Sequence, residues 1–248
     1  MAWGTLDHAI AACPITTTTD LVGTEVVRGG VVAADRAVTT TSATRAKRGS
    51  RVVKATLDAV LAALLLVWLS PLLLLLMLAV RLDSAGPAVF RQVRVGKDGR
   101  HFEVLKLRTM VDGAEDLKGS LLAANESDGG VLFKIRRDPR ITRLGALLRR
   151  SSLDELPQLV NVLRGEMSLV GPRPALPDEV AVMDEEALRR FTVRPGMTGL
   201  WQVSGRSNLG WSEARAFDTY YADNWTVRGD LAILVRTAKA VVTAEGAC

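Results

Sequence analysis

The chain has 248 residues, 48% of them hydrophobic and 24% charged, which predicts one very apolar segment attached to an ordinary polar domain. The two cysteines, Cys13 and Cys248, stand near opposite ends and exclude a disulfide framework or a Cys-x-x-Cys metal site, while two histidines argue against a zinc enzyme or a chymotrypsin-like triad. The net charge of +5 suits an anionic membrane face, a nucleotide or a nucleic acid, and does not choose among them.

Residues 1–50 show no hydrophobic periodicity and carry two threonine clusters among scattered Gly, Ala and Val. This composition predicts a disordered tail, and the sequence assigns it no role. It is not a signal peptide, because no basic region precedes a long apolar core. We therefore divide the chain into a tail at 1–50, a membrane segment at 51–82 and a polar domain at 83–248.

The membrane segment contains a run without charge at residues 59–80. A straight helix of that length reaches about 33 Å, close to the hydrocarbon thickness of a bilayer. A buried core helix would be shorter and amphipathic. The run therefore predicts insertion into a membrane.

Two features favour a re-entrant helix over a simple span. Ser70-Pro71 lies at the midpoint, where proline removes a backbone donor and predicts a kink. Basic residues flank both ends, whereas a spanning helix normally keeps its basic flank on the cytoplasmic side only. A helix–break–helix that enters and leaves the same leaflet satisfies both flanks, with Ser70 placed to bond a freed carbonyl. A kinked spanning helix is the alternative. The flanking residues are Arg45, Lys47, Arg48, Arg51 and Lys54 before the segment, and Arg81, Arg91, Arg94 and Lys97 after it.

The sequence pattern of the polar domain predicts an α+β fold that is mostly helical, with a short β-hairpin or sheet and amphipathic interfacial helices. Ser168–Pro174 is too rich in Gly and Pro for regular structure, and Val193–Arg206 is loop-rich. The expected strands cover residues 87–95 and 101–108, and the expected helices cover 141–150, 156–164, 178–191, 213–224 and 231–244.

Adjacent carboxylates, Asp154 and Glu155, stand just before the second of these helices. Pro157 fits only the first helical turn, which places both acids at the helix N-terminus, where free N–H groups favour ionised carboxylates and attract phosphate. A capping box, Ser152-x-x-Glu155, with Asp154 as ordinary first-turn charge, is the simpler interpretation.

The neighbouring segments favour a phosphate site. Arg173 lies between two prolines, and a purely structural turn needs no arginine there, whereas a fixed guanidinium suits phosphate. A basic run precedes the carboxylates, and either forms a solvated face or, given Leu144, Leu147 and Leu148, an amphipathic helix on anionic lipid. The run comprises Lys134, Arg136, Arg137, Arg140, Arg143, Arg149 and Arg150.

Four motifs in this order resemble the bacterial sugar transferases, the monotopic polyprenyl-phosphate phosphoglycosyl transferases. They are Lys106–Met110, Ser152–Gln158, Ser168–Pro174 and Val193–Arg206, and the apolar segment with Ser70-Pro71 resembles the re-entrant helix of that family. The resemblance covers roughly residues 51–245.

The resemblance implies transfer of a sugar-1-phosphate from a UDP-sugar to undecaprenyl phosphate, with release of UMP. This would be the first membrane step of exopolysaccharide, capsule, O-antigen or glycoprotein glycan assembly. It implies that Asp154 is the nucleophile and forms a phosphosugar-enzyme intermediate, that Glu155 is its partner in metal or proton handling, and that Mg²⁺ binds at the pair. The residues that would contact substrate are Lys106, Arg108, Arg173, Arg194, Gln202 and Arg206.

The resemblance also implies a monotopic protein of the inner membrane whose catalytic domain faces the cytoplasm. The rival hypothesis is a non-catalytic scaffold of the same fold that recruits glycan-assembly partners. A nucleic-acid binder fits less well, because no aromatic residues are interleaved with the basic run. The sequence leaves open the sugar, the final glycan and whether the chain forms a homo-oligomer.

Re-entrant geometry predicts that both termini lie on the cytoplasmic side. Cys13 and Cys248 flank the membrane segment and are the only thiols. An impermeant thiol reagent should therefore label neither in intact spheroplasts and both after lysis. Labelling of just one of them in intact spheroplasts would establish a span.

Overall fold

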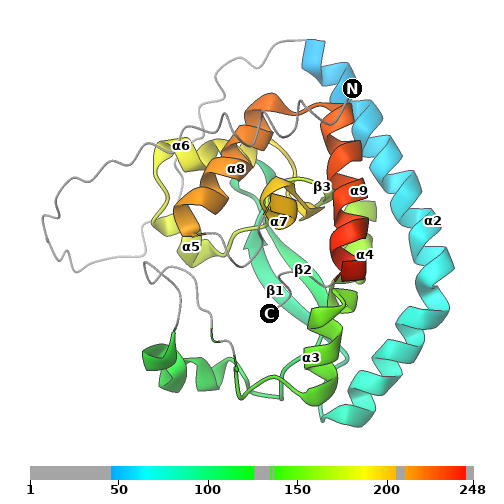
Figure 1. Cartoon of the computed structure of the whole chain (residues 1–248), viewed down its shortest axis with the longest axis vertical. Coiled ribbons are helices and arrows are strands. Elements are labelled where there is room, and N and C mark those ends of the chain that lie inside the picture. Colours follow the sequence, from blue (N-terminus) through cyan, green and yellow to red (C-terminus); the bar gives the residue numbers. More distant parts are fainter. Residues whose placement is uncertain (1–45, 126–134, 136, 205–209, 244–248) are drawn as a thin grey trace, which may run out of the picture.

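The computed structural model describes residues 46–125, 135, 137–204 and 210–243. These residues form a mostly helical fold with two small two-stranded sheets, which confirms the predicted class (Figure 1). The helices are α2 (Ala46–Asp83), α3 (Arg143–Arg150), α4 (Gln158–Leu163), α5 (Pro177–Ala181), α6 (Glu185–Leu188), α7 (Leu200–Ser204), α8 (Trp211–Asn224) and α9 (Val227–Thr243). The strands are β1 (Val89–Val95), β2 (His101–Leu107), β3 (Ser168–Val170) and β4 (Gly196–Thr198), and the 3-10 turns are η1 (Lys97–Gly99), η2 (Asp116–Ala124), η3 (Leu153–Glu155) and η4 (Arg189–Thr192).

The apolar segment lies in α2, which follows an arc along the outside of the molecule (Figure 1). The helix begins at Ala46, within the segment predicted to be a tail, and continues through Pro71 without the predicted break. Proline at position 71 leaves the carbonyl of Val67 without its helical donor, and the Ser70 hydroxyl donates to that carbonyl at 2.8 Å. Because the freed carbonyl is satisfied locally, the helix continues through Pro71 instead of ending.

One side of α2 packs on the domain along its length. Ala62 is fully buried in a cluster with Leu159 and Leu169, and Val80 is buried further along in a second cluster with Leu107 and Leu148. The other side exposes large apolar residues, among them Val67 at 75% and Trp68 at 77%. Within the described residues α2 is the helix that is long and apolar enough to cross a membrane.

The antiparallel pair β1–β2 confirms the predicted hairpin. The buried side chain of Asn161 in α4 fastens this hairpin to α4. Its Oδ1 accepts from the backbone N–H of Leu105 at 3.1 Å, and its Nδ2 donates to the carbonyl of Glu103 at 2.7 Å. These bonds fix the alignment of β2 beside α4, and therefore place Lys106 of β2 near the acids that precede α4.

The parallel pair β3–β4 corrects the prediction that Ser168–Pro174 lacks regular structure. A Cβ at Gly171 would lie 2.5 Å from the carbonyl oxygen of Arg194, and one at Gly196 would lie 2.0 Å from the nitrogen of Gly171. Glycine is therefore needed because two backbones touch. The same glycines that suggested a loop allow the two strands to approach.

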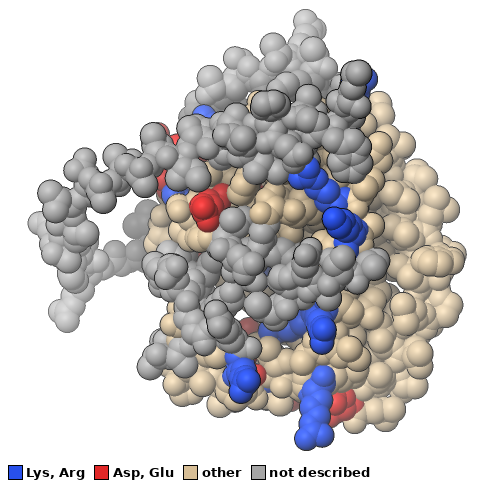
Figure 2. Space-filling view, in the orientation of Figure 1, with Lys and Arg blue, Asp and Glu red and all other residues tan. Residues whose placement is uncertain are grey.

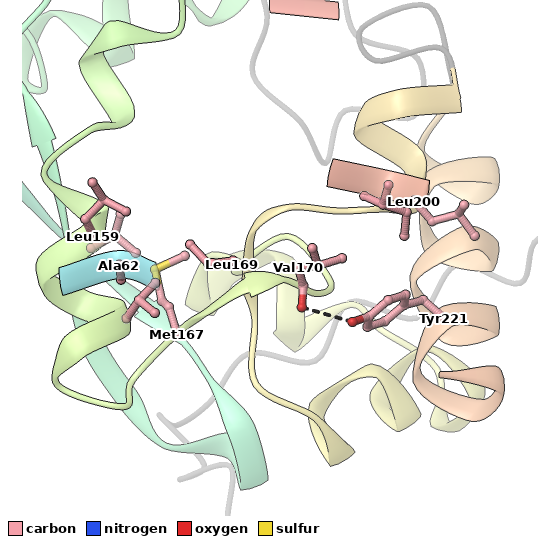
Figure 3. Packing of buried hydrophobic residues seen from close by; sticks show 10 residues of the cluster. Ala62, Leu159, Met167, Leu169, Val170, Leu200 and Tyr221 are labelled. Carbon is pink, nitrogen blue, oxygen red and sulfur yellow. Dashed lines mark hydrogen bonds between the residues drawn. The ribbon is translucent and has the colours of Figure 1, made fainter. Parts of the chain in front are cut away.

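A hydrogen-bonded network joins the start of α2 to the C-terminal helices. Lys54 contacts Asp58 at 3.2 Å and Asp230 of α9 at 2.7 Å. Asp230 also accepts from the Tyr221 hydroxyl at 2.7 Å and from the Trp225 indole at 2.9 Å. Tyr221 packs in the main hydrophobic cluster, where its hydroxyl also bonds the carbonyl of Val170 (Figure 3).

Replacing Ser70 with Leu and Pro71 with Ala should straighten α2, because the missing backbone donor returns and the competing hydroxyl is removed. We expect some molecules to convert to a spanning form in which Cys248 is labelled by the impermeant reagent in intact spheroplasts. Ser70→Ala alone keeps the proline and serves as the control. Unchanged labelling and full activity in the double variant would contradict a role for the pair.

Candidate active site

A strained backbone turn presents the two carboxylates. Ser152 adopts a left-handed conformation with φ +56°, which is unusual for a residue other than glycine, and η3 follows directly. The Ser152 side chain makes no capping hydrogen bond, so the capping-box interpretation is wrong. Pro157 occupies the N-terminal end of α4, as predicted. Local strain of this kind is typical of functional sites.

Lys106 and Glu155 form an ion pair at 2.7 Å beside Asp154. Glu155 stays about one-third exposed, whereas Asp154 is only 7% exposed. Within the described part of the chain, no side chain donates a hydrogen bond to the Asp154 carboxylate. The structure thus brings three predicted site residues together and gives the two acids different surroundings.

Burial raises the pKa of Asp154 from its ordinary value near 4 to about 6. The positive charges of Lys106 and Arg149 oppose this rise, and the negative charge of Glu155 adds to it. A carboxylate that burial destabilises gains from any cation or electrophile that approaches it. The two acids therefore differ: Asp154 is the one that an approaching cation or electrophile would stabilise, and Glu155 is already paired with Lys106.

Arg149 is a site residue that sequence reasoning did not single out from the basic run. Its Nε donates to the Thr109 hydroxyl at 2.9 Å, and its charge acts on Asp154. Gly145 permits this contact, since a Cβ there would lie 2.0 Å from the carbonyl oxygen of Thr109. The signal in the sequence was its position, since Arg149 lies in the last turn of the helix that leads into the strained turn.

Arg173 lies in the loop that follows β3, with one-third of its side chain exposed. Its Nη1 donates to the buried Glu179 carboxylate at 3.2 Å. Arg94 connects this loop with the carboxylate pair electrostatically. Burial and the charge of Arg173 lower the pKa of Arg94 to about 10, while the charges of Glu179 and Glu155 act in the opposite direction.

The other predicted substrate residues lie apart from the pair or outside the described residues. Arg108 is buried and donates to the carbonyl of Ser84 at 2.7 Å, at the end of α2. The Arg194 guanidinium lies beside Gly165 in the turn after α4. Gln202 donates to the carbonyl of Met197 at 3.4 Å. Arg206 lies outside the described residues.

The donor set suits Mg²⁺ better than a metal held wholly by protein. Within the described residues there is no group of three or more acids, histidines or cysteines that could hold an ion. Mg²⁺ is commonly bound by one or two carboxylates together with water and substrate phosphates. Asp154, which has no side-chain donor among the described residues, and Glu155, about one-third exposed, fit that pattern.

Basic side chains gather on one face of the molecule, over the region of α3 and around a hollow where an acidic side chain is visible (Figure 2). Phosphoryl groups need cations that neutralise developing charge more than they need strong acids and bases. An exposed apolar helix, a carboxylate pair and surrounding cations define a membrane-associated site suited to phosphoryl transfer. Residues 49–244 match the family described as bacterial sugar transferase, and the chain belongs to that family.

Named relatives share this region. The chain is 44% identical over 205 residues to the undecaprenyl-phosphate galactose phosphotransferase of Salmonella typhimurium, which covers 82% of this chain and 43% of that protein. It is 44% identical over 202 residues to the UDP-glucose:undecaprenyl-phosphate glucose-1-phosphate transferase of Caulobacter vibrioides, covering 78% and 71%. It is 41% identical over 196 residues to the exopolysaccharide production protein ExoY of Sinorhizobium fredii, covering 78% and 87%. The chain thus spans less than half of the Salmonella protein and most of ExoY.

Removing the Asp154 charge should stabilise the protein near neutral pH. Because the folded-state pKa is raised, the stability that the protonated group contributes is present below about pH 4 and lost as pH rises through about 6. We expect Asp154→Asn to melt above the parent at about pH 7.5, by a difference worth about 3 kcal/mol at most, and the gap to close toward pH 4. The measurement is thermal unfolding in detergent with a chelator present.

Asp138→Asn provides a control of opposite sign. Its bond to Arg140 lowers the pKa of Asp138, so its loss should destabilise the protein at neutral pH. An Asp154→Asn variant that melts below the parent across the whole range would contradict the burial argument.

Proposed function

We propose that this chain transfers a sugar-1-phosphate from a UDP-sugar to undecaprenyl phosphate and releases UMP, as the first membrane step in assembling a cell-surface glycan. The observation that carries the proposal is the pair of adjacent acids with opposite surroundings. Asp154 is buried and receives no hydrogen bond from a side chain within the described ranges, while Glu155 is paired with Lys106. The family and the names of the relatives support the same reaction.

In the first step, a carboxylate oxygen of Asp154 attacks the β-phosphorus of the UDP-sugar. A phosphorus–oxygen bond forms at Asp154, and the bond to the bridging oxygen breaks, so that UMP leaves with that oxygen. The charge on the diphosphate must be neutralised as it develops. Lys106 and Arg149 supply positive charge beside Asp154.

In the second step, a phosphate oxygen of undecaprenyl phosphate attacks the same phosphorus and releases Asp154 as a carboxylate. Splitting the transfer in two allows the large nucleotide and the large lipid to bind one after the other. Asp154 and Glu155 would hold Mg²⁺, which would supply positive charge to neutralise the diphosphate. Arg173, Arg194, Gln202, Arg108 and Arg206 remain proposed substrate contacts.

The proposed anchor is re-entrant, with α2 entering and leaving the cytoplasmic leaflet of the inner membrane. The basic flanks at both ends and the curved course of α2 (Figure 1) support this geometry. Packing of α2 on the domain along its length also supports it, because a helix that crosses the bilayer could not keep both ends on one polar domain. The site would then lie at the level of the lipid head groups.

A non-catalytic scaffold is the rival function. A scaffold has no use for a buried carboxylate that costs folding stability, next to a strained turn and two cations. Release of UMP from a panel of UDP-sugars by membranes that contain the protein would separate the two functions.

Asp154→Asn should abolish turnover while folding and membrane insertion survive, because it removes the nucleophile and keeps the size of the side chain. We expect UMP release to fall by at least about 10³-fold. Rapid quench with UDP-sugar and Mg²⁺ in the absence of lipid, followed by mass spectrometry, should find sugar phosphate on the Asp154 peptide of the parent only.

Two further variants make this test specific. Glu155→Gln should turn over slowly yet still form the adduct, since it retains Asp154. Asp178→Asn removes an exposed acid in the first turn of α5 and should keep parental activity. An Asp154→Asn protein that releases UMP at the parental rate would disprove the covalent mechanism.

A further inference from the structure

The described residues contain a buried ion pair that the proposed chemistry does not use. Arg190 of η4 and Asp218 of α8 are 4% and 2% exposed and bond each other. Arg190 Nη2 also donates to the backbone carbonyl of Arg173 at 2.6 Å. The pair is therefore bonded, through the Arg190 guanidinium, to the loop that carries Arg173.

Four successive carbonyls of this loop each accept a hydrogen bond. The carbonyl of Pro172 accepts from Gly196 N–H at 2.8 Å, and that of Arg173 accepts from Arg190. The carbonyl of Pro174 accepts from Arg94 at 3.0 Å, and that of Ala175 accepts from Val95 N–H at 2.9 Å. The backbone of the loop is thus fixed residue by residue, whereas the Arg173 side chain stays one-third exposed.

The pair leaves two of its own polar atoms unsatisfied in the described ranges. Asp218 Oδ1 and Arg190 Nε are buried without a hydrogen-bond partner among the described residues. Burial raises the pKa of Asp218 despite the neighbouring arginines, so desolvation outweighs their attraction. Buried pairs of this kind can often be replaced by apolar residues without loss of stability, and what such a replacement removes here is the bond to Arg173.

We propose that the Arg190–Asp218 pair is a positioning device that fixes the backbone at Arg173 and so directs its guanidinium toward the diphosphate of the nucleotide sugar. This inference rests on the proposed function. Neither Arg190 nor Asp218 touches substrate, since both side chains are buried beneath the loop. Asp218 holds the Arg190 guanidinium, and Arg190 holds the carbonyl of Arg173.

The test replaces the pair with apolar residues, Arg190→Met together with Asp218→Leu, in the full-length protein. In the parental background we expect kcat/KM for the UDP-sugar to fall about tenfold or more, mainly through KM. In an Arg173→Ala background the same replacement should change kcat/KM little, because the residue through which it acts is absent. Equal losses in both backgrounds would overturn the inference.

A matched control uses the other buried Arg–Asp pair, Arg140 and Asp138. Arg140 also donates to a backbone carbonyl, that of Ala114 at 3.1 Å, but outside the Arg173 loop. Arg140→Met with Asp138→Leu should therefore have the same effect on kcat/KM whether or not Arg173 is present. A dependence on Arg173 equal to that of the Arg190–Asp218 replacement would show that the effect is only general softening.

Hydrogen exchange without substrate separates this inference from the proposed function. In the Arg190→Met, Asp218→Leu protein, the peptide covering residues 171–176 should exchange about tenfold faster, while the β1–β2 hairpin keeps its protection. If the parent releases no UMP from any UDP-sugar, the proposed function fails, yet the exchange still decides whether the pair orders the loop. Unchanged exchange at 171–176 overturns the inference whatever the activity.

Discussion

The geometry of this molecule depends on the contact of Lys54 with two carboxylates, one on its own helix and one on α9. Two acids share one ammonium group in a partly buried site, so the remaining negative charge must be met by other donors. Asp230 receives them from Tyr221 and Trp225, and Ser168 donates to Asp58. A network in which every acid is satisfied is rigid, whereas one that lacks a member leaves a buried charge uncompensated.

This network sets where the site lies relative to the apolar helix. Ser168 begins β3 and is bonded to α2, while the carbonyl of Val170 ends β3 and is bonded to Tyr221. The Arg173 loop follows immediately after β3. The strand from which the loop starts is therefore bonded to α2 at its first residue and to α8 at its last. On the opposite side, Asn161 fixes β2 to α4 and thereby places Lys106 next to Glu155. Both halves of the site are thus held in place by hydrogen bonds to α2 or to elements of the domain on which α2 packs.

The sequence predicted the elements whose signals are local. A long uncharged run, two alternating segments around a glycine turn and a proline in a first turn each led to the observed helix, hairpin and turn. The β3–β4 pair was missed because Gly171 and Gly196 are adjacent only after folding, and each alone indicates a loop. Arg149 was missed for a similar reason, since its partner Thr109 lies 40 residues away. The sequence predicted a break at Pro71, but the helix continues there. The Ser70 hydroxyl supplies a donor to the carbonyl that Pro71 leaves without one, and this bond sustains the helix.

The arginines show most clearly which roles depend on burial in the fold and cannot be predicted from the sequence alone. Within the described residues, Arg94, Arg108, Arg140 and Arg190 are each at most 8% exposed, and each donates to a backbone carbonyl. A guanidinium suits this task because its several fixed donors can hold a carbonyl and an acid at once. Arg173 differs, since one-third of its side chain is exposed above a backbone that Arg94 and Arg190 hold. Burial therefore separates arginines whose guanidinium holds a backbone carbonyl from Arg173, whose side chain is partly open to solvent. A motif alone does not show this difference, because Arg108 and Arg173 both stand in family-like segments.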